Sequence, residues 1–237
     1  HDVGISCRRI VNGLKELQID MAQVEGIFIS HEHSDHIAGL QQLLKRFDIP
    51  VYTKQGTWRE IQDKLIVPKN QLIELTKGSL TLGNLIVEPF AVSHDAADPI
   101  GINVFAGKDK ATVVTDTGVI SDSILRRMDD TTLLVLEANY DPHMLRFGPY
   151  QPFLKQRVAS DEGHLSNEMA AQALLMMNRP DFMQVILAHR SENNNNAVLV
   201  TQTIGKMLVD GGVRIGPEMK LQHGQPNEIV SMKSVKR

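Results

Sequence analysis

The sequence concentrates metal-binding side chains in one six-residue run, HEHSDH, at positions 31–36. Imidazole and carboxylate groups are the ligands that zinc, manganese and iron take in N/O-donor sites. Because alternate residues of an extended chain share a side, His31 and His33 are placed to hold one metal ion together. Asp35 and His36 stand where the chain is predicted to turn into a helix, and they are placed to face a second ion.

Four more residues of similar chemistry stand at the ends of predicted strands. Apolar or β-branched runs predict strands at residues 26–30, 85–92, 111–115, 132–136 and 184–188. The run at 31–36 follows the first strand, and the other four strands are followed by His94, Asp116, Glu137 and His189. Clefts in α/β sheets form at the carboxyl ends of strands, so we expect these side chains to meet at one site.

Helical spacing of apolar residues separates several of these strands. It predicts helices at residues 37–47, at residues 58–65 ahead of Pro68, and after Ser166, which is placed as an N-cap. Further short strands are predicted at residues 213–215, 219–221 and 228–232. Strands that alternate with helices indicate an α/β architecture.

Composition narrows the function classes. The 237 residues carry a net charge of −3, so contact with nucleic acid must rest on a local basic patch or on metal ions. No run approaches eighteen apolar residues and no signal-peptide pattern is visible, so we expect no membrane contact and a cytoplasmic location. The single cysteine, Cys7, rules out an intrachain disulfide and a cysteine-rich zinc site, and it fits a reducing compartment.

The H-x-H-x-D-H run after a strand, followed by a strand-end His, a strand-end Asp and a late strand-end His, resembles the signature of the metallo-β-lactamase fold. The resemblance covers nearly the whole chain and implies one α/β domain, residues 1–237, built as a four-layer αββα sandwich. It also implies two divalent metal ions, zinc or manganese. Carried over residue by residue, one ion takes His31, His33 and His94, the other takes Asp35, His36 and His189, and Asp116 bridges both.

Asp2, in the string Asp-Val-Gly, resembles the first motif of this family. In the family, this Asp supports the metal site through hydrogen bonds from behind the ligands. The family also has strands before this residue. We therefore expect the first strands of the fold to lie outside the sequence given.

The stretch after Asp116 narrows the resemblance. Glu137, the string Gly-His-Leu-Ser at 163–166 and the string His-Arg-Ser at 189–191 follow the order of the transfer-RNA 3′-processing nucleases, in which a Glu-His pair donates a proton. Only 47 residues separate Asp116 from His164, too few for the domain that is inserted in β-CASP nucleases. The whole string is most similar to the compact bacterial YycJ/WalJ group, which implies a double-stranded DNA exonuclease acting 5′ to 3′.

This resemblance implies hydrolysis of a phosphodiester. Two ions about 3.5–4 Å apart share a water and lower its pKa toward about 7. Asp35 would orient the attacking hydroxide while it also binds metal. His164, kept cationic by Glu137, would protonate the leaving oxygen.

Residues 140–157 are predicted as a loop that contacts the substrate. Four of the eleven aromatic residues lie there, interleaved with three basic ones. Aromatic faces stack on bases and basic groups meet phosphates, so Tyr150, Lys155 and Arg157 are the candidate substrate contacts. The alternative is that the aromatic residues only anchor the loop. His143 and His223 lack such a context and are predicted to be ordinary surface residues.

Other functions stay open from the residues alone. A small-molecule phosphodiesterase is favoured if residues 140–157 close the cleft, and a lactone or thioester hydrolase of the glyoxalase-II type would use the same metals. A metal-dependent scaffold without turnover would be free to lose the ligands that this sequence retains. Glu137, His164 and the basic segment favour nucleic acid as the partner, because an acyl hydrolase needs no phosphate-binding segment.

Overall fold

A computed structural model of the protein describes residues 1–76, 78–225 and 228–231. The chain divides into two compact units, one formed by residues 1–83 with 96–100 and the other by residues 84–95 with 101 onward. Both units combine strands with helices, which confirms the predicted α/β architecture. That the whole chain forms one domain stays a prediction. Within the described ranges, no helix is both long and apolar enough to cross a membrane.

The first unit is built around a small parallel sheet ordered β1-β2-β3. Its helices pack on an apolar core that includes Ile29, Leu40 and Trp58. Strand β1 ends shortly before the run at 31–36, so this sheet positions the run. In chain order the elements are α1 (Cys7–Glu16), the 3-10 helix η1 (Met21–Gln23), β1 (Ile27–Phe28), α2 (Ser34–Ile37), α3 (Leu40–Arg46), β2 (Val51–Thr53), α4 (Gln55–Lys64), the 3-10 helix η2 (Lys69–Gln71), β3 (Leu72–Glu74) and β4 (Leu80–Leu82).

The second unit is built around a larger sheet, in which its strands are ordered β10-β9-β8-β7-β6-β5. Strands β7 to β10 run parallel to one another, and β6 runs antiparallel to β7. Parallel neighbours end at the same edge, so the sheet brings together the residues that follow β7, β8 and β9. In chain order the elements are β5 (Leu85–Ala91), β6 (Ile100–Ala106), β7 (Asp109–Val114), α5 (Asp122–Met128), β8 (Leu133–Glu137), α6 (Pro142–Phe147), α7 (Pro152–Val158), α8 (Asn167–Met176), β9 (Met183–Ala188), α9 (Ala197–Asp210) and β10 (Met219–His223).

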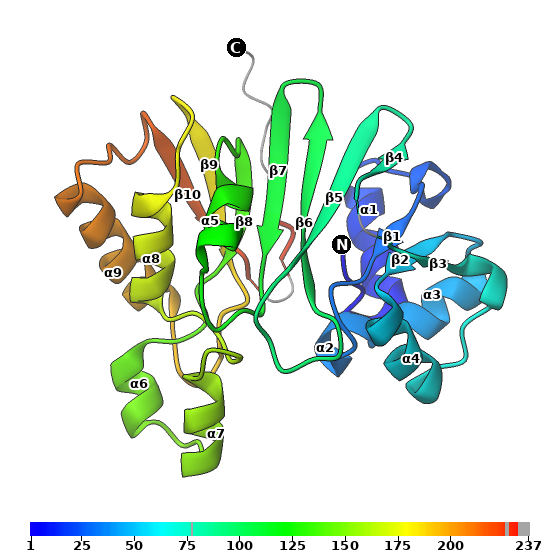
Figure 1. Cartoon of the computed structure of the whole chain (residues 1–237), viewed down its shortest axis with the longest axis horizontal. Coiled ribbons are helices and arrows are strands. Elements are labelled where there is room, and N and C mark those ends of the chain that lie inside the picture. Colours follow the sequence, from blue (N-terminus) through cyan, green and yellow to red (C-terminus); the bar gives the residue numbers. More distant parts are fainter. Residues whose placement is uncertain (77, 226–227, 232–237) are drawn as a thin grey trace. The chain divides into compact units, whose positions relative to one another are not determined.

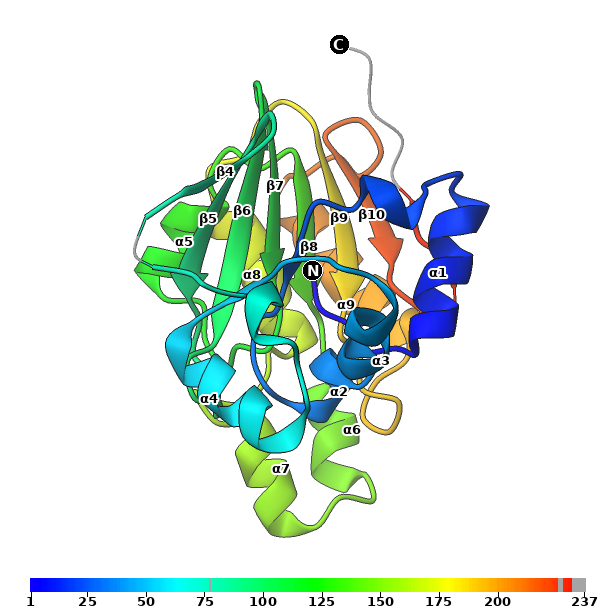
Figure 2. The ribbon, with the colours of Figure 1, turned by 90° about the vertical axis from the view of Figure 1, so that its right-hand side faces the viewer.

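One apolar core holds the second unit together. Helices α5, α8 and α9 lie on one side of the sheet (Figures 1 and 2) and pack against alternate strand residues such as Leu134 and Leu136 of β8. Each fully buried leucine of this kind contributes about 1.5–3 kcal/mol relative to exposure. Helix α8 begins as predicted, because the Ser166 hydroxyl accepts a hydrogen bond from the Met169 amide 3.2 Å away.

The predicted helix at 37–47 is two helices, α2 and α3, with a break at Gly39. The N-terminal segment passes close to this point. The Gly39 amide donates a hydrogen bond to the Val3 carbonyl 2.8 Å away, and a Cβ on residue 39 would lie 2.1 Å from the Ile5 carbonyl oxygen. A tertiary contact that requires glycine therefore overrides the helical spacing.

Residues 140–157 are not the loop that the sequence predicts. They contain two short helices, α6 and α7, each with a proline in its first turn, at Pro142 and Pro152. The Asp141 carboxylate caps α6 by accepting a hydrogen bond from the Met144 amide 2.8 Å away. Helices of six and seven residues are too short to display a helical repeat, which explains the wrong prediction.

The strands predicted at 85–92, 111–115, 132–136, 184–188 and 219–221 are confirmed to within two residues at each end. The prediction at 213–215 is wrong, since Ile215 forms only an isolated bridge with Met219. Residues 228–231 form no strand, and residue 232 lies outside the described residues.

Candidate metal centre

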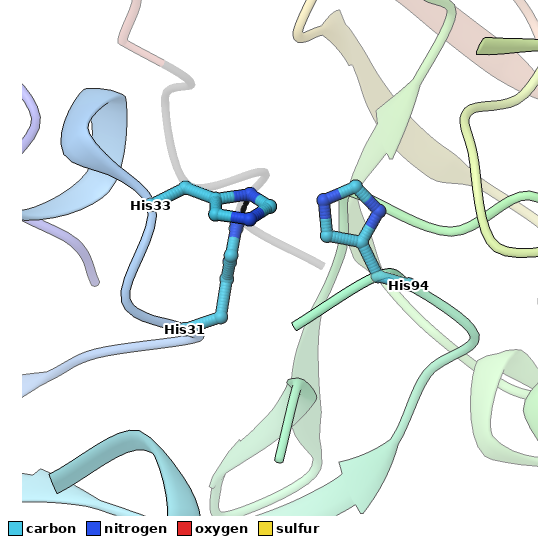
Figure 3. Close-up of side chains that lie close together, drawn as sticks. All are labelled: His31, His33 and His94. Carbon is cyan, nitrogen blue, oxygen red and sulfur yellow. Dashed lines mark hydrogen bonds between the residues drawn. The ribbon is translucent and has the colours of Figure 1, made fainter. Parts of the chain in front are cut away.

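The run at 31–36 follows β1 in the first unit, and its first two histidines turn their rings toward each other. His31 Nε2 lies 3.0 Å from His33 Nδ1, and the ring centroids are 4.6 Å apart (Figure 3). His31 is buried and His33 is partly exposed. This arrangement suits the shared metal ion that the sequence predicts, because imidazole nitrogens are borderline ligands for zinc and manganese.

Asp2 lies behind this run and orients its rings. The Asp2 carboxylate accepts hydrogen bonds from the Ser30 amide at 2.7 Å, the Ser30 hydroxyl at 2.9 Å and His36 Nδ1 at 2.8 Å. Since the Ser30 hydroxyl proton is directed to Asp2, the Ser30 oxygen accepts from His31 Nδ1, 2.9 Å away. Both histidines thus carry their proton on Nδ1, which leaves Nε2 as the ligand atom. These contacts support the role that the family resemblance implies for Asp2, which stays a prediction.

Electrostatics keep Asp2 ionised. Burial alone would raise the pKa of Asp2, but the neighbouring His1 and His36 imidazoles lower this pKa well below its ordinary range. His36 lies on helix α2, and its Nε2 atom is 3.6 Å from Asp35 Oδ2. The Asp35 side chain is 66% exposed.

Asp2→Asn is expected to weaken metal binding and activity by roughly 10- to 100-fold, the usual cost of losing a group that orients a ligand. An asparagine NH2 group that faces His36 Nδ1 would donate a hydrogen bond to it, which would favour the tautomer with the His36 proton on Nε2 and block the ligand atom. Metal affinity measured by competition with a chromogenic chelator checks this.

Asp63→Asn is the matched control, because Asp63 is an exposed carboxylate on α4 of the same unit. It removes the same charge and is expected to keep wild-type metal affinity. Equal affinities for the wild type and Asp2→Asn would show that Asp2 does not orient the ligands.

Asp116 is the centre of the site in the second unit. It follows β7, its side chain is only 3% exposed, and its Oδ1 atom is surrounded by imidazoles. Oδ1 lies 3.7 Å from His94 Nε2, 3.4 Å from His189 Nε2 and 3.8 Å from His164 Nδ1. One carboxylate among several imidazole nitrogens has the composition of a metal-ligand group, and the bridging role of Asp116 stays a prediction.

Glu137, the last residue of β8, is fully buried and orients two histidines at once. Its Oε1 atom accepts hydrogen bonds from His164 Nδ1 and His189 Nδ1, each 2.8 Å away. Its Oε2 atom accepts from the Thr117 and Leu165 amides, each 3.2 Å away. Burial alone would raise the pKa of Glu137, but the hydrogen bonds and charges of His164 and then His189 hold it well below its ordinary value. A buried, ionised carboxylate with this many donors is a rigid support for both rings.

In His94 and His189, the hydrogen bond that Nδ1 makes determines that Nε2 is the atom available as a ligand. His94 Nδ1 donates to the Gly163 carbonyl 3.1 Å away and His189 Nδ1 donates to Glu137, so Nε2 of each ring is directed toward Asp116. Burial lowers the pKa of His94, against the opposing charge of Asp116, and this favours the neutral imidazole that binds metal.

Buried asparagines, which the sequence analysis did not single out, lock the ends of β8 and β9 together. The Asn139 side chain donates to the His189 carbonyl 2.8 Å away. Asn195 donates to the carbonyls of Ala138 and Asn139 at 3.0 and 3.1 Å and pairs with Asn167. The asparagine run at 193–196 was the only signal for this network, and runs of this kind are common in loops.

Left-handed backbone marks three of the site positions. The φ angles are 55° at Asp2, 55° at Asp116 and 52° at His189. Non-glycine residues rarely adopt this region, and each such position costs on the order of 1–3 kcal/mol. The surrounding hydrogen bonds therefore hold these three side chains in orientations that an unconstrained strand end would not adopt.

The donor set of the second unit fits a divalent metal ion. Asp116, Glu137, His164 and His189 each offer a ligand atom, and these four atoms lie within 4.8 Å of one another. All are nitrogen or oxygen donors, which suits zinc or manganese and not a metal that requires thiolates. Because Glu137 is already satisfied by four donors, Asp116 and His189 are the better ligands of this group.

The predicted substrate residues are engaged in contacts within the second unit. Lys155 Nζ donates to the Arg146 carbonyl 2.8 Å away, and the Arg157 guanidinium forms an ion pair with Asp95. Tyr150 is partly buried against a small apolar cluster under α6 and α7. These contacts hold α6 and α7 in place, and a role of the three residues in substrate binding stays a prediction.

The two histidines that were predicted to be ordinary surface residues differ. His143 is exposed on α6, as predicted. His223 at the end of β10 is half-buried, and its Nε2 lies 2.9 Å from the Thr201 hydroxyl. Neither residue belongs to a candidate group of metal ligands among the described residues.

The chain belongs to the beta-lactamase superfamily, because the domain model of that family matches residues 8–189. Its fold is the α/β metallo-β-lactamase fold. The exodeoxyribonuclease YycJ of Bacillus anthracis is 34% identical over 227 residues, which cover 95% of this chain and 86% of that protein. The exodeoxyribonuclease WalJ of Streptococcus pneumoniae serotype 2 is 31% identical over 231 residues, with coverage of 95% and 86%. The resemblance to the YycJ/WalJ group is thereby confirmed.

Solved structures show the same fold at lower sequence identity. The metallo-β-lactamase fold protein YhfI of Bacillus subtilis is 17% identical with a TM-score of 0.61, and the match covers 84% of this chain and 75% of that one. The short form of human tRNase Z is 21% identical with a TM-score of 0.52, and the match covers 76% and 77%. At these identities the likeness extends to the fold alone.

Proposed function

We propose that the protein is a metal-dependent phosphodiesterase acting on nucleic acid, and in particular a double-stranded DNA exonuclease that acts 5′ to 3′. The observation that carries this proposal is the hydrogen bond from His164 Nδ1 to the buried Glu137 carboxylate, beside Asp116. A DNA strand leaves as an alkoxide, which needs a proton, and a carboxylate-held imidazole is suited to supply one. The relatives that are named exodeoxyribonucleases match 95% of the chain and support DNA as the substrate.

The proposed cofactor is a pair of divalent ions, zinc or manganese. Membership of the superfamily and the nitrogen and oxygen donors of both units support it. When bound, such ions supply Lewis acidity toward a water and a phosphodiester. The residues proposed to hold them are His31, His33 and His94 for one ion, Asp35, His36 and His189 for the other, and Asp116 for both.

The protein's own groups then have separate tasks. The exposed Asp35 carboxylate orients the attacking water, and His164 donates the proton on Nε2 to the leaving oxygen. Glu137 accepts the hydrogen bond from His164 Nδ1 and orients the ring for that transfer. Tyr150, Lys155 and Arg157 remain candidates for contact with the DNA strand. A DNA substrate also supports a cytoplasmic location for the enzyme.

Digestion of a 5′-phosphorylated DNA duplex with Mn²⁺ tests the proposal. One sample carries a label at the 5′ end and a second carries it at the 3′ end, and Asp35→Asn is assayed beside the wild type. We expect the wild type to release 5′ label as nucleotides and to shorten the 3′-labelled strand stepwise, while Asp35→Asn leaves both intact.

Each other outcome contradicts a defined part of the proposal. Release of 3′ label first would reverse the polarity, and cleavage of RNA alone would change the substrate. Hydrolysis of bis(nitrophenyl) phosphate without cleavage of DNA would favour a small-molecule phosphodiesterase. Hydrolysis of a thioester alone would favour the glyoxalase-II type of activity.

A further inference from the structure

Helices α6 and α7 expose two large aromatic side chains. Phe147 is 67% exposed and Phe153 is 71% exposed. The other two aromatic residues of this segment behave differently, since Tyr140 is buried and Tyr150 is partly buried in the apolar cluster beneath the helices. The tyrosines therefore anchor the segment, and the two phenylalanines face solvent.

The exposed Phe147 ring lies beside a cationic side chain. The Arg146 guanidinium carbon lies 5.3 Å from the centroid of the Phe147 ring, and the His143 ring lies 4.6 Å from it. Residues 142–160 include two arginines and a lysine but no aspartate or glutamate, although the chain carries 28 acidic residues. A protein with a net charge of −3 thus presents exposed aromatic rings and cations together on one short segment.

The backbone at the end of α7 contacts the backbone at His164, one of the two residues of the proposed catalytic pair His164–Glu137. The His164 amide donates to the Val158 carbonyl at the end of α7, 2.9 Å away. A Cβ on Gly163 would lie 2.3 Å from the carbonyl oxygens of Arg157 and Val158, so the chain returns tightly from α7 to His164. Figures 1 and 2 show α6 and α7 extending beyond the carboxyl ends of β7, β8 and β9, the strand ends that carry Asp116, Glu137 and His189.

We propose that Phe147 and Phe153 form a base-stacking surface for the nucleic acid substrate, and that Arg146 contacts its phosphates. This inference rests on the proposed function and adds to it the residues that grip the strand. The Arg146 cation beside the Phe147 ring favours a polyanion with flat aromatic groups over an apolar protein partner. Lys155 donates to the Arg146 carbonyl and Arg157 pairs with Asp95, so both charges are engaged within the unit.

The test compares Phe147→Leu and Phe153→Leu with Phe147→Trp and Phe153→Trp. Leucine keeps an apolar side chain but removes the aromatic face, whereas tryptophan keeps it. We expect each leucine variant to raise KM for duplex DNA about 5- to 100-fold, with a smaller change in kcat, and each tryptophan variant to restore KM. Met176→Ala on α8 is the control, because Met176 is 68% exposed on the same unit and is expected to keep the wild-type KM.

A second measurement needs no turnover. The chain has one tryptophan, Trp58, which is buried in the first unit. Phe153→Trp therefore adds an exposed reporter, and we expect its fluorescence to be quenched by a single-stranded oligonucleotide. Unchanged KM in the leucine variants, or no quenching, would overturn the stacking surface even if the enzyme degrades DNA. If the fluorescence is quenched but the protein cleaves no nucleic acid, the stacking surface would be supported and the proposed function would be contradicted.

Discussion

Asp116→Asn is expected to remove the bound metal and the hydrolytic activity together. Asp116 Oδ1 lies within 3.8 Å of nitrogens from three imidazoles in the second unit, and an amide oxygen is a much weaker ligand than a carboxylate. The metal ions supply several kcal/mol of transition-state stabilisation, and losing them corresponds to a fall of about a thousandfold or more in rate. Metal content by mass spectrometry and DNA digestion are measured on the same preparation.

Asp130→Asn is a matched control for this variant. Asp130 also has a left-handed backbone, with a φ of 57°, and it lies on the exposed turn before β8. Asparagine tolerates this region, so neither substitution is expected to disturb the backbone. If Asp116→Asn retains two ions per chain and wild-type digestion, Asp116 is not the bridging ligand.

His164→Ala is expected to slow DNA hydrolysis by about 100- to 10,000-fold while the metal content stays at the wild-type level. His164 Nδ1 is held by Glu137, so Nε2 is the ring atom that we expect to donate the proton. The loss should be much smaller for bis(nitrophenyl) phosphate, because nitrophenolate leaves without a proton. The ratio of the two rates is the measurement, and it separates proton donation from a general disturbance of the site.

The same variant distinguishes a proton donor from a ligand. His164 belongs to the group of four residues whose ligand atoms lie within 4.8 Å of one another, so a ligand role is a real alternative. Loss of a metal ion in His164→Ala, or an equal loss of rate on both substrates, would show that His164 acts as a metal ligand. His164 would then not be the proton donor to the leaving group.

Much of the site was predictable from where its residues stand relative to strands. Asp116, Glu137 and His189 each end or follow a β-branched run, and parallel pairing of β7, β8 and β9 places these ends at one edge. The run at 31–36 was predictable for the same reason, and it needs only a local strand before it. Asp2 was recognised only through the family resemblance, because a single Asp-Val-Gly string has no pattern of its own.

The supporting contacts were not predictable, because they depend on residues far apart in the chain. Asn195 bonds to the end of β8, more than fifty residues away, and no spacing rule connects them. Gly39 breaks a helix because the N-terminal segment passes over it. Helices α6 and α7 are shorter than two helical turns, so their apolar residues show no repeat. Local patterns thus located the candidate ligands, and tertiary packing determined how each one is held.

The left-handed backbone at Asp2, Asp116 and His189 restricts which amino-acid substitutions are favourable at these positions. Glycine is the residue that adopts such a conformation most readily, but glycine has no side chain to bind or orient a metal ion. Selection for thermal stability and selection for activity therefore favour different residues at the same three positions. Variants chosen for heat resistance alone would be drawn toward glycine there, and the fold would be retained after the catalyst was lost.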